Sequence, residues 1–254
     1  MGSQHHDTVQ FRGARFTHAD LTGVTIRDCD LTGLQIVDCI LGEAVVSGDF
    51  SQLLVNDVDV TAYVQAELDR RQPERVRVRS LRGAKDHRDT WAAVEQMWAA
   101  THARLASLPE SLLTRRVGEE WSVLETMRHL VFATDAWIGA AILGQPQPFH
   151  PAGLPAGGYP DDLSAQLGLE LHVMPSFAQM LAVRAERIAT VAGVVADLTD
   201  ERLAHACQKA PAPGYPEHRR IVADCLRVVM NEEVEHHRYL VRDLAILQSD
   251  GDDL

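Results

Sequence analysis

The sequence predicts an α+β protein that is mainly α-helical, with a short repetitive segment followed by a four-helix bundle. Three observations support this fold class. A five-residue repeat runs near the N-terminus, four long segments farther along have apolar residues at helical spacing, and residues that cap or break helices bound those segments. We expect three regions, which cover residues 1–58, 59–88 and 89–250.

The composition limits the classes of function. The chain has 254 residues, of which 46% are hydrophobic, enough to bury a sizeable core. Its formal net charge of −12 disfavours binding to nucleic acid or to an anionic membrane, because both need a basic surface. The first residues lack the apolar core of a signal peptide, no apolar run reaches the length of a membrane span, and the four cysteines form no C-x-x-C pair. We therefore expect a cytoplasmic protein that acts on a small-molecule substrate, with a homodimer as an open alternative to the monomer.

The repeat places a large apolar residue at the first position of every five. These residues are Phe11, Phe16, Leu21, Ile26, Leu31, Ile36, Leu41 and Val46. A period of five fits neither a helix of about 3.6 residues per turn nor a strand, and it predicts a chain that turns a corner at each repeat. The pattern resembles the pentapeptide-repeat proteins, whose chains wind a square β-helix with four repeats per coil, so we expect a two-coil β-helix. Cys29 and Cys39 fall at equivalent positions, and we expect them to stack inside the coils as small apolar side chains.

The residues after the repeat predict a short helix over 60–71 that Pro73 ends, and then a basic linker up to residue 88. The first helix of the bundle is predicted to begin at Asp89, which can cap it, and to run to about Ser107.

The other three bundle helices have their own boundary signals. Ser122 and Glu125 form a capping box that opens the second helix, and Ser176 opens the third helix in the same way. The last helix is predicted over 216–248. A long loop rich in proline and glycine, over 145–161, separates the second and third helices, and loops of this length often carry function.

The last helix carries two carboxylate–histidine pairs. Glu233 lies in the middle of the apolar stripe with His237 one turn farther on, whereas Glu232 and His236 lie toward the margins of the stripe. A carboxylate inside such a stripe is costly unless it is paired or bound to metal. Glu233 and His237 are therefore the preferred metal ligands, and Glu232 and His236 are the alternative pair. The alternative without a metal is that these residues form a solvent-exposed charged patch at one end of the bundle.

The second bundle helix places His129 among apolar residues, in the sequence Glu120-Trp-Ser-Val-Leu-Glu-Thr-Met-Arg-His-Leu. Together with Asn231-Glu-Glu-Val-Glu-His-His-Arg-Tyr, this segment resembles the DinB-like family of four-helix-bundle metalloproteins, from about Asp89 to Leu247. In that family a Trp-Ser-x-x-x-x-x-x-His helix supplies one metal ligand, and a His-x-x-x-His on the fourth helix supplies two more.

The resemblance implies that His129, Glu233 and His237 bind a divalent metal ion, with Glu233 in place of a histidine. Zinc or nickel is the leading expectation, and iron or manganese is the alternative. Characterised relatives use low-molecular-weight thiols, so the resemblance also implies a thiol that the metal holds as a thiolate, or a metal-bound hydroxide without a thiol. Glu233 and His150 are the candidate catalytic residues, and Trp137 is the candidate cofactor-binding residue.

The predicted function is therefore that of a metal-dependent enzyme, a thiol-dependent S-transferase or isomerase. The alternative is a non-enzymatic scaffold with a vestigial metal site, in which the repeat docks a partner. Bound metal in the purified protein distinguishes the two.

Overall fold

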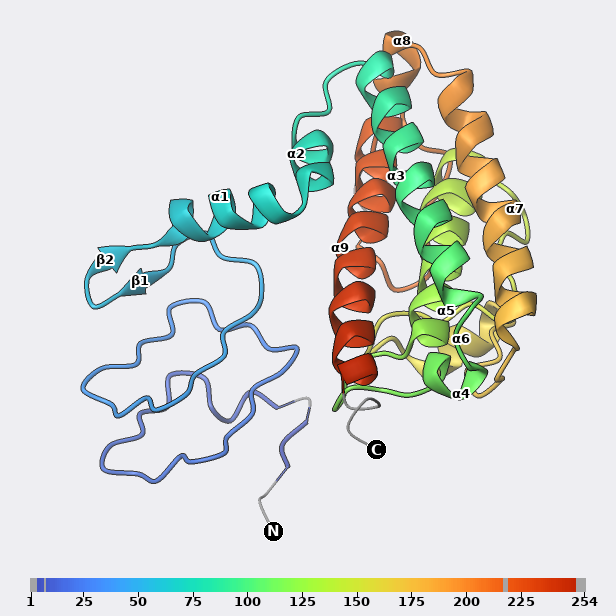
Figure 1. Ribbon diagram of the computed structural model, residues 1–254. Helices are drawn as coiled ribbons and strands as arrows, with labels where there is room; N and C mark the ends of the chain where they lie inside the picture. Colours follow the sequence, from blue (N-terminus) through green and yellow to red (C-terminus); the bar gives the residue numbers. More distant parts are fainter. Residues whose placement is uncertain (1–3, 7, 217–218, 250–254) are drawn as a thin grey trace. The chain divides into compact units, whose positions relative to one another are not determined.

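The computed structural model describes residues 4–6, 8–216 and 219–249, and the chain divides into two units, Met1–Asp49 and Phe50–Leu254 (Figure 1). Most of the second unit is helical, which confirms the mainly α fold class. Within the described part of the chain, no helix has the length and apolar content that a membrane span requires.

The first unit, which contains the repeat, turns a corner once in every five residues. Backbone with positive φ recurs at that interval, at Gly13, His18, Gly23, Asp28, Gly33 and Asp38. Glycine adopts this conformation without steric cost, which explains its place at alternate corners. Hydrogen bonds close the glycine corners, as where the amide of Val24 donates to the carbonyl of Leu21 at 3.1 Å. The backbone therefore confirms the predicted corner in six of the eight repeats.

Cys29 and Cys39 are exposed, although the sequence analysis placed them inside the coils. The Sγ atom of Cys29 donates to the carbonyl of Arg27 at 3.1 Å, and that of Cys39 donates to the carbonyl of Val37 at 3.4 Å. Every described residue up to Asp49 is exposed, and so are large apolar residues of the repeat such as Phe16, Leu21 and Ile26, so these repeats do not enclose a buried column.

The second unit begins with a small hairpin. Strands β1 (Leu54–Val55) and β2 (Val58–Asp59) pair antiparallel around Asn56 and Asp57, which both have positive φ. Two such residues are typical of the tight turns that join hairpin strands. Helix α1 (Thr61–Arg71) follows where the sequence predicted a short helix.

Helix α2 (Pro73–Arg79) occupies part of the predicted linker. Pro73 begins this helix, because proline is favoured at the first helical position, where no amide hydrogen is needed. The arginines of α2 pair with carboxylates on other elements. Arg79 binds Asp69 of α1, and Arg75 Nε lies 3.3 Å from Glu235 Oε1.

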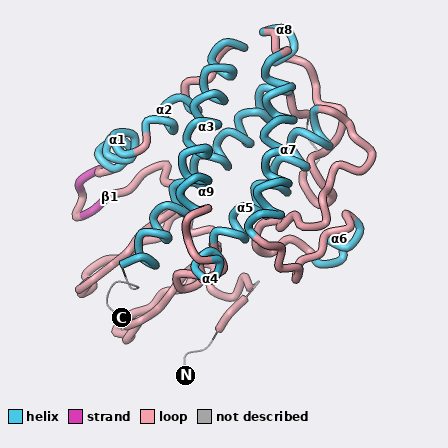
Figure 2. The backbone as a smooth tube through the Cα atoms, turned by 45° about the vertical axis from the view of Figure 1, so that its right-hand side comes forward, coloured by secondary structure: helices cyan, strands magenta, loops and turns pink. Residues whose placement is uncertain are grey.

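Four long helices pack side by side and form the core (Figure 1, Figure 2). They are α3 (Ala84–Leu105), α5 (Val123–Thr134), α7 (Phe177–Ala196) and α9 (Val222–Ser249). Each packs against two of the others, and the π-helical segment η1 (Asp135–Ile142) continues α5. Fully buried side chains from all four fill the interior, among them Trp98, Met127, Met180 and Leu226.

Short helices lie in the connections, namely α4 (Glu110–Leu113), α6 (Asp161–Gln166) and α8 (Asp200–Leu203). Ser122 and Ser176 cap α5 and α7 with complete capping boxes, as predicted.

The start of α3 differs from the prediction. The helix begins at Ala84 rather than at Asp89, and the amide of Ala84 donates to the carboxylate of Asp200 at 2.6 Å. A residue from the distant helix α8 thus satisfies an amide that no helical carbonyl can reach.

Candidate metal centre

Three side chains that can bind metal converge where α5 packs against α9. His129 lies two turns after the N-cap Ser122 of α5, and Glu232 and His236 lie one turn apart in α9. The capping box fixes the start of α5, since the amide of Ser122 donates to the Glu125 carboxylate at 2.9 Å. A signal in the local sequence therefore sets the position of His129.

The donor atoms of this group are close enough to share one ion. Among the described residues, His129, Glu232 and His236 are the one group of three potential ligands whose donor atoms all lie within 4.8 Å of one another. Glu232 Oε2 lies 3.2 Å from His129 Nε2 and 3.0 Å from His236 Nε2. Ligands at ~2.0–2.2 Å from a tetrahedral ion are about 3.4 Å apart, so small movements would complete the site.

The three side chains of the centre are only partly exposed to solvent. The His129 side chain is 8% exposed, that of His236 20% and that of Glu232 29%. Burial opposes the ionised form of Glu232, but the hydrogen bonds from His129 and His236 and the charges of these rings outweigh it and lower the pKa of Glu232 to about 2. The carboxylate is therefore ionised at neutral pH, which is the form that binds metal. Two histidines and one carboxylate leave a fourth position open for water or a substrate.

The second nitrogen of His129 is also engaged. Nδ1 donates to the carbonyl of Leu154 at 3.1 Å, which leaves Nε2 as the ligand atom. The neighbouring Arg128 holds the loop that presents this carbonyl, because its guanidinium donates to the carbonyls of Ala152 and Glu170, both at 2.9 Å. Arg128 and His129 together tie the long loop to α5.

Trp121 forms an aromatic wall of the centre. Its ring centroid lies 4.6 Å from that of His129 and 5.6 Å from that of His236. The sequence alone predicts no role for Trp121, although the Trp-Ser pair of the family pattern is a signal for it. The Leu154 carbonyl had no such signal, because a backbone acceptor has no residue preference.

The structure does not bring Glu233 and His237 to His129, although the sequence analysis preferred them as ligands. Glu233 Oε2 accepts a hydrogen bond from Arg184 Nη2 at 2.6 Å, and both side chains are buried. His237 Nε2 shares a hydrogen bond with Thr101 Oγ1 at 2.7 Å, and burial lowers its pKa to about 4. The apolar stripe of α9 does contain a buried carboxylate, as predicted, but its partner is Arg184. The alternative pair, Glu232 and His236, lies beside His129 instead.

The candidate catalytic residue His150 does not belong to the group of three. The backbone amide of His150 donates to Asp135 at 2.8 Å, and its ring Nδ1 accepts the amide of Ala152 at 3.1 Å, so the ring closes a turn of its own loop. The Trp137 ring lies 5.6 Å from the ring of Tyr215.

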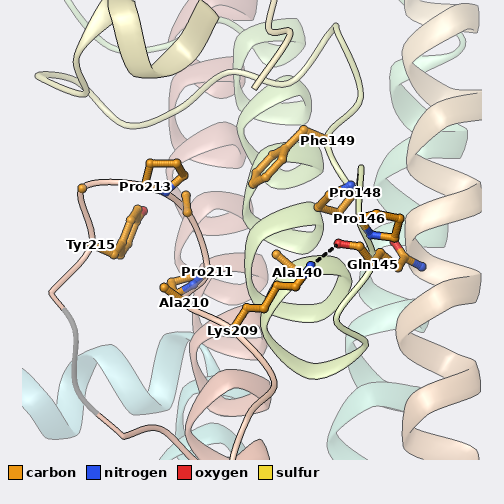
Figure 3. A pocket seen from close by; sticks show the side chains of 12 residues that line it. Ala140, Gln145, Pro146, Pro148, Phe149, Lys209, Ala210, Pro211, Pro213 and Tyr215 are labelled. Carbon is orange, nitrogen blue, oxygen red and sulfur yellow. Dashed lines mark hydrogen bonds between the residues drawn. The ribbon is translucent and has the colours of Figure 1, made fainter. Parts of the chain in front are cut away.

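A cavity of about 350 Å³ lies between η1, the loop after it and the segment before α9 (Figure 3). Its walls come from Ala140 and from residues within 145–149 and 209–215, which are mostly apolar. Tyr215 lines it, and burial together with the charge of Glu232 raises the pKa of Tyr215.

Comparisons with known families agree with this arrangement. A model of the DinB superfamily matches residues 93–240, which include all three residues of the centre, and a model of pentapeptide repeats matches eight copies over residues 9–45. No curated protein and no solved structure matches the chain. Because the first match covers more than half of the chain, the protein belongs to the DinB superfamily and carries pentapeptide repeats at its N-terminus.

Proposed function

We propose that the protein is a metal-dependent enzyme in which His129, Glu232 and His236 bind one divalent ion. The observation that carries the proposal is the convergence of three donor atoms within 4.8 Å, from two helices that are far apart in sequence. The reaction is attack of a thiol, or of water, on an electrophilic small molecule. Membership of the DinB superfamily supports this class of chemistry.

The donor set fits a borderline ion such as zinc or nickel. A bound ion would acidify a thiol or a water molecule beside it, which produces a nucleophile at neutral pH. Glu232 contributes a negative charge that three histidines would not, and so moderates this acidity. The Leu154 carbonyl holds the His129 ring in place, and Trp121 shields one side of both histidines from water.

The first experiment measures bound metal. The protein is purified without a tag, its metal content is determined by elemental analysis, and the metal-free form is titrated with zinc and nickel. Changes in the residues around a metal ligand cost about 10–100-fold in affinity, so His129→Ala and His236→Ala, which remove ligands, should cost more than about 100-fold. His237→Ala is the matched control, because it removes the next histidine of α9 but no donor atom of the centre.

Two results would contradict the proposal. One is a protein that binds no metal and whose melting temperature does not respond to metal or chelator, which would favour the scaffold alternative. The other is a loss of metal in His237→Ala that equals the loss in His236→Ala, since the ligands would then be a different set.

A second experiment tests the chemistry. The metal-loaded protein is incubated with a low-molecular-weight thiol and an electrophile, and consumption of the thiol is followed. We expect turnover that falls to background on chelation and in Glu232→Gln. Turnover of an electrophilic ester without any thiol would identify metal-activated water as the nucleophile instead. No turnover with either nucleophile would contradict the proposed enzymatic activity but not the proposed metal site.

A further inference from the structure

Two cysteines outside the candidate centre face each other at the start of α9. Cys225 lies in the first turn of the helix and is fully buried, and Cys207 lies after α8 and is partly buried. Their Sγ atoms are 3.3 Å apart, although the residues are separated by 18 positions. Sulfur atoms in a disulfide are about 2.05 Å apart, so rotation of the side chains can close most of the gap.

The backbone holds this pair in register. Ala206 and Ile221 form an antiparallel bridge, and the amide of Cys207 donates to the carbonyl of Arg220 at 2.9 Å. On the other side of the bridge, the amide of Val222 donates to the carbonyl of His205 at 3.0 Å. The close approach of the two sulfur atoms therefore rests on paired backbone segments and not on two mobile side chains alone.

We propose that Cys207 and Cys225 are a redox-active pair that a low-molecular-weight disulfide oxidises reversibly to an intramolecular disulfide bond. The thiolate of Cys207 attacks one sulfur of the small disulfide, forms a mixed disulfide and releases one thiol. The sulfur of Cys225 then attacks Sγ of Cys207 and releases the second thiol. Two protein thiols are oxidised, one small disulfide is reduced, and the two protons pass to the two released thiols.

Cys207 is the residue that reacts first. It is partly exposed, whereas Cys225 is fully buried. Burial raises the pKa of both thiols, and for Cys225 the hydrogen bond and the charge of Cys207 raise it further. Both steps need a thiolate, so burial slows each of them. The Sγ–Sγ distance of 3.3 Å favours closure by Cys225 over attack on the mixed disulfide by an external thiol.

The bond would tie α9 to one wall of the cavity in Figure 3. The segment that lines this wall, residues 209–215, begins two residues after Cys207 and includes Tyr215. Oxidation would fix one end of this segment to the first turn of α9. The proposal does not depend on the metal or on the enzymatic reaction.

The experiment uses the full chain with Cys29→Ser and Cys39→Ser, because both of those thiols are exposed and would also react. The protein is incubated with oxidised glutathione, quenched with acid and measured by intact mass and peptide mapping. We expect the mass to fall by two hydrogen atoms, a peptide that joins Cys207 to Cys225, a higher melting temperature and full reversal by dithiothreitol.

Single substitutions in the same background test the order of steps. With Cys225→Ser we expect one stable glutathione adduct on Cys207, and with Cys207→Ser we expect Cys225 to stay unmodified in the folded protein. Stable glutathione adducts on Cys207 while Cys225 is present would overturn the proposal. So would folded protein that keeps both thiols under conditions that fully oxidise the urea-unfolded protein.

Discussion

The buried pair of Arg184 and Glu233 gives the most direct test of the structure. The two side chains are 0% and 1% exposed, and Arg184 Nε and Nη1 have no hydrogen-bond partner among the described residues. Glu233→Gln keeps the shape of the side chain but leaves a guanidinium buried without its counter-ion. Breaking one partner of a buried ion pair costs about 3–5 kcal/mol of the free energy of unfolding. At about 2–4 °C per kcal/mol for a chain of this size, the melting temperature should fall by about 6–20 °C.

The neighbouring carboxylate is the matched control. Glu232→Gln in the metal-free protein weakens the hydrogen bonds of a partly exposed carboxylate and buries no unpaired charge, so it should cost less, about 1–3 kcal/mol. Urea unfolding followed by far-UV circular dichroism measures both variants under the same conditions. In metal titrations of the same samples, Glu232→Gln should weaken metal affinity more than Glu233→Gln does.

A double variant separates loss of charge pairing from loss of packing. Arg184→Met with Glu233→Leu replaces the pair by apolar side chains of similar size, which is often neutral for a buried ion pair. We expect it to recover most of the stability that Glu233→Gln loses. If Glu233→Gln melts within about 2 °C of the unaltered protein, or if the double variant is no more stable than the single one, the buried pair does not have the role that we assign to it.

Three further predictions concern Ser122, His102 and Arg128. Ser122→Ala removes the cap of α5 and should lower the free energy of unfolding by about 1 kcal/mol in urea titrations, whereas an unchanged midpoint would contradict the capping role. Burial lowers the pKa of His102 to about 4, so the folded protein keeps this ring neutral. The free energy of unfolding should therefore be unaffected by His102 above the unfolded-state pKa of about 6.5 and should fall as the pH drops from there toward 4. His102→Gln should flatten this pH dependence by up to about 1.4 kcal/mol per pH unit, and an unchanged slope would contradict the lowered pKa of His102. Arg128→Met frees the loop carbonyls and should speed amide hydrogen exchange within residues 150–173, with exchange in α7 as the internal control.

The sequence predicted the features that depend on neighbouring residues. The five-residue period, the caps at Ser122 and Ser176, and the position of His129 all follow from local patterns, and the structure contains each of them. The mainly α fold also follows, because long amphipathic segments must bury their apolar faces against one another.

What the sequence did not predict depends on partners that are distant along the chain. Asp200 caps α3 from 116 positions away, and Arg184 reaches Glu233 across 49 positions. A buried carboxylate is compatible with a metal or with an arginine, and spacing along one helix does not distinguish them. The preference for Glu233 as a ligand rested on its place in the apolar stripe, on its spacing to His237 and on the family pattern, and none of these identifies the residue that the facing helix presents.

The ion pair with Arg184 also supports the orientation in which α9 packs against α5. The helix offers two carboxylate–histidine pairs of the same spacing, Glu232 with His236 and Glu233 with His237, about 100° apart around its axis. Exchanging them would need a rotation of about 100°, which would turn the buried apolar face of α9 away from the core. Arg184 adds to the stability of the observed orientation, because it gives the buried Glu233 a counter-ion. Helix α7, which supplies none of the three donor atoms, thus stabilises the orientation of α9 that places Glu232 and His236 beside His129.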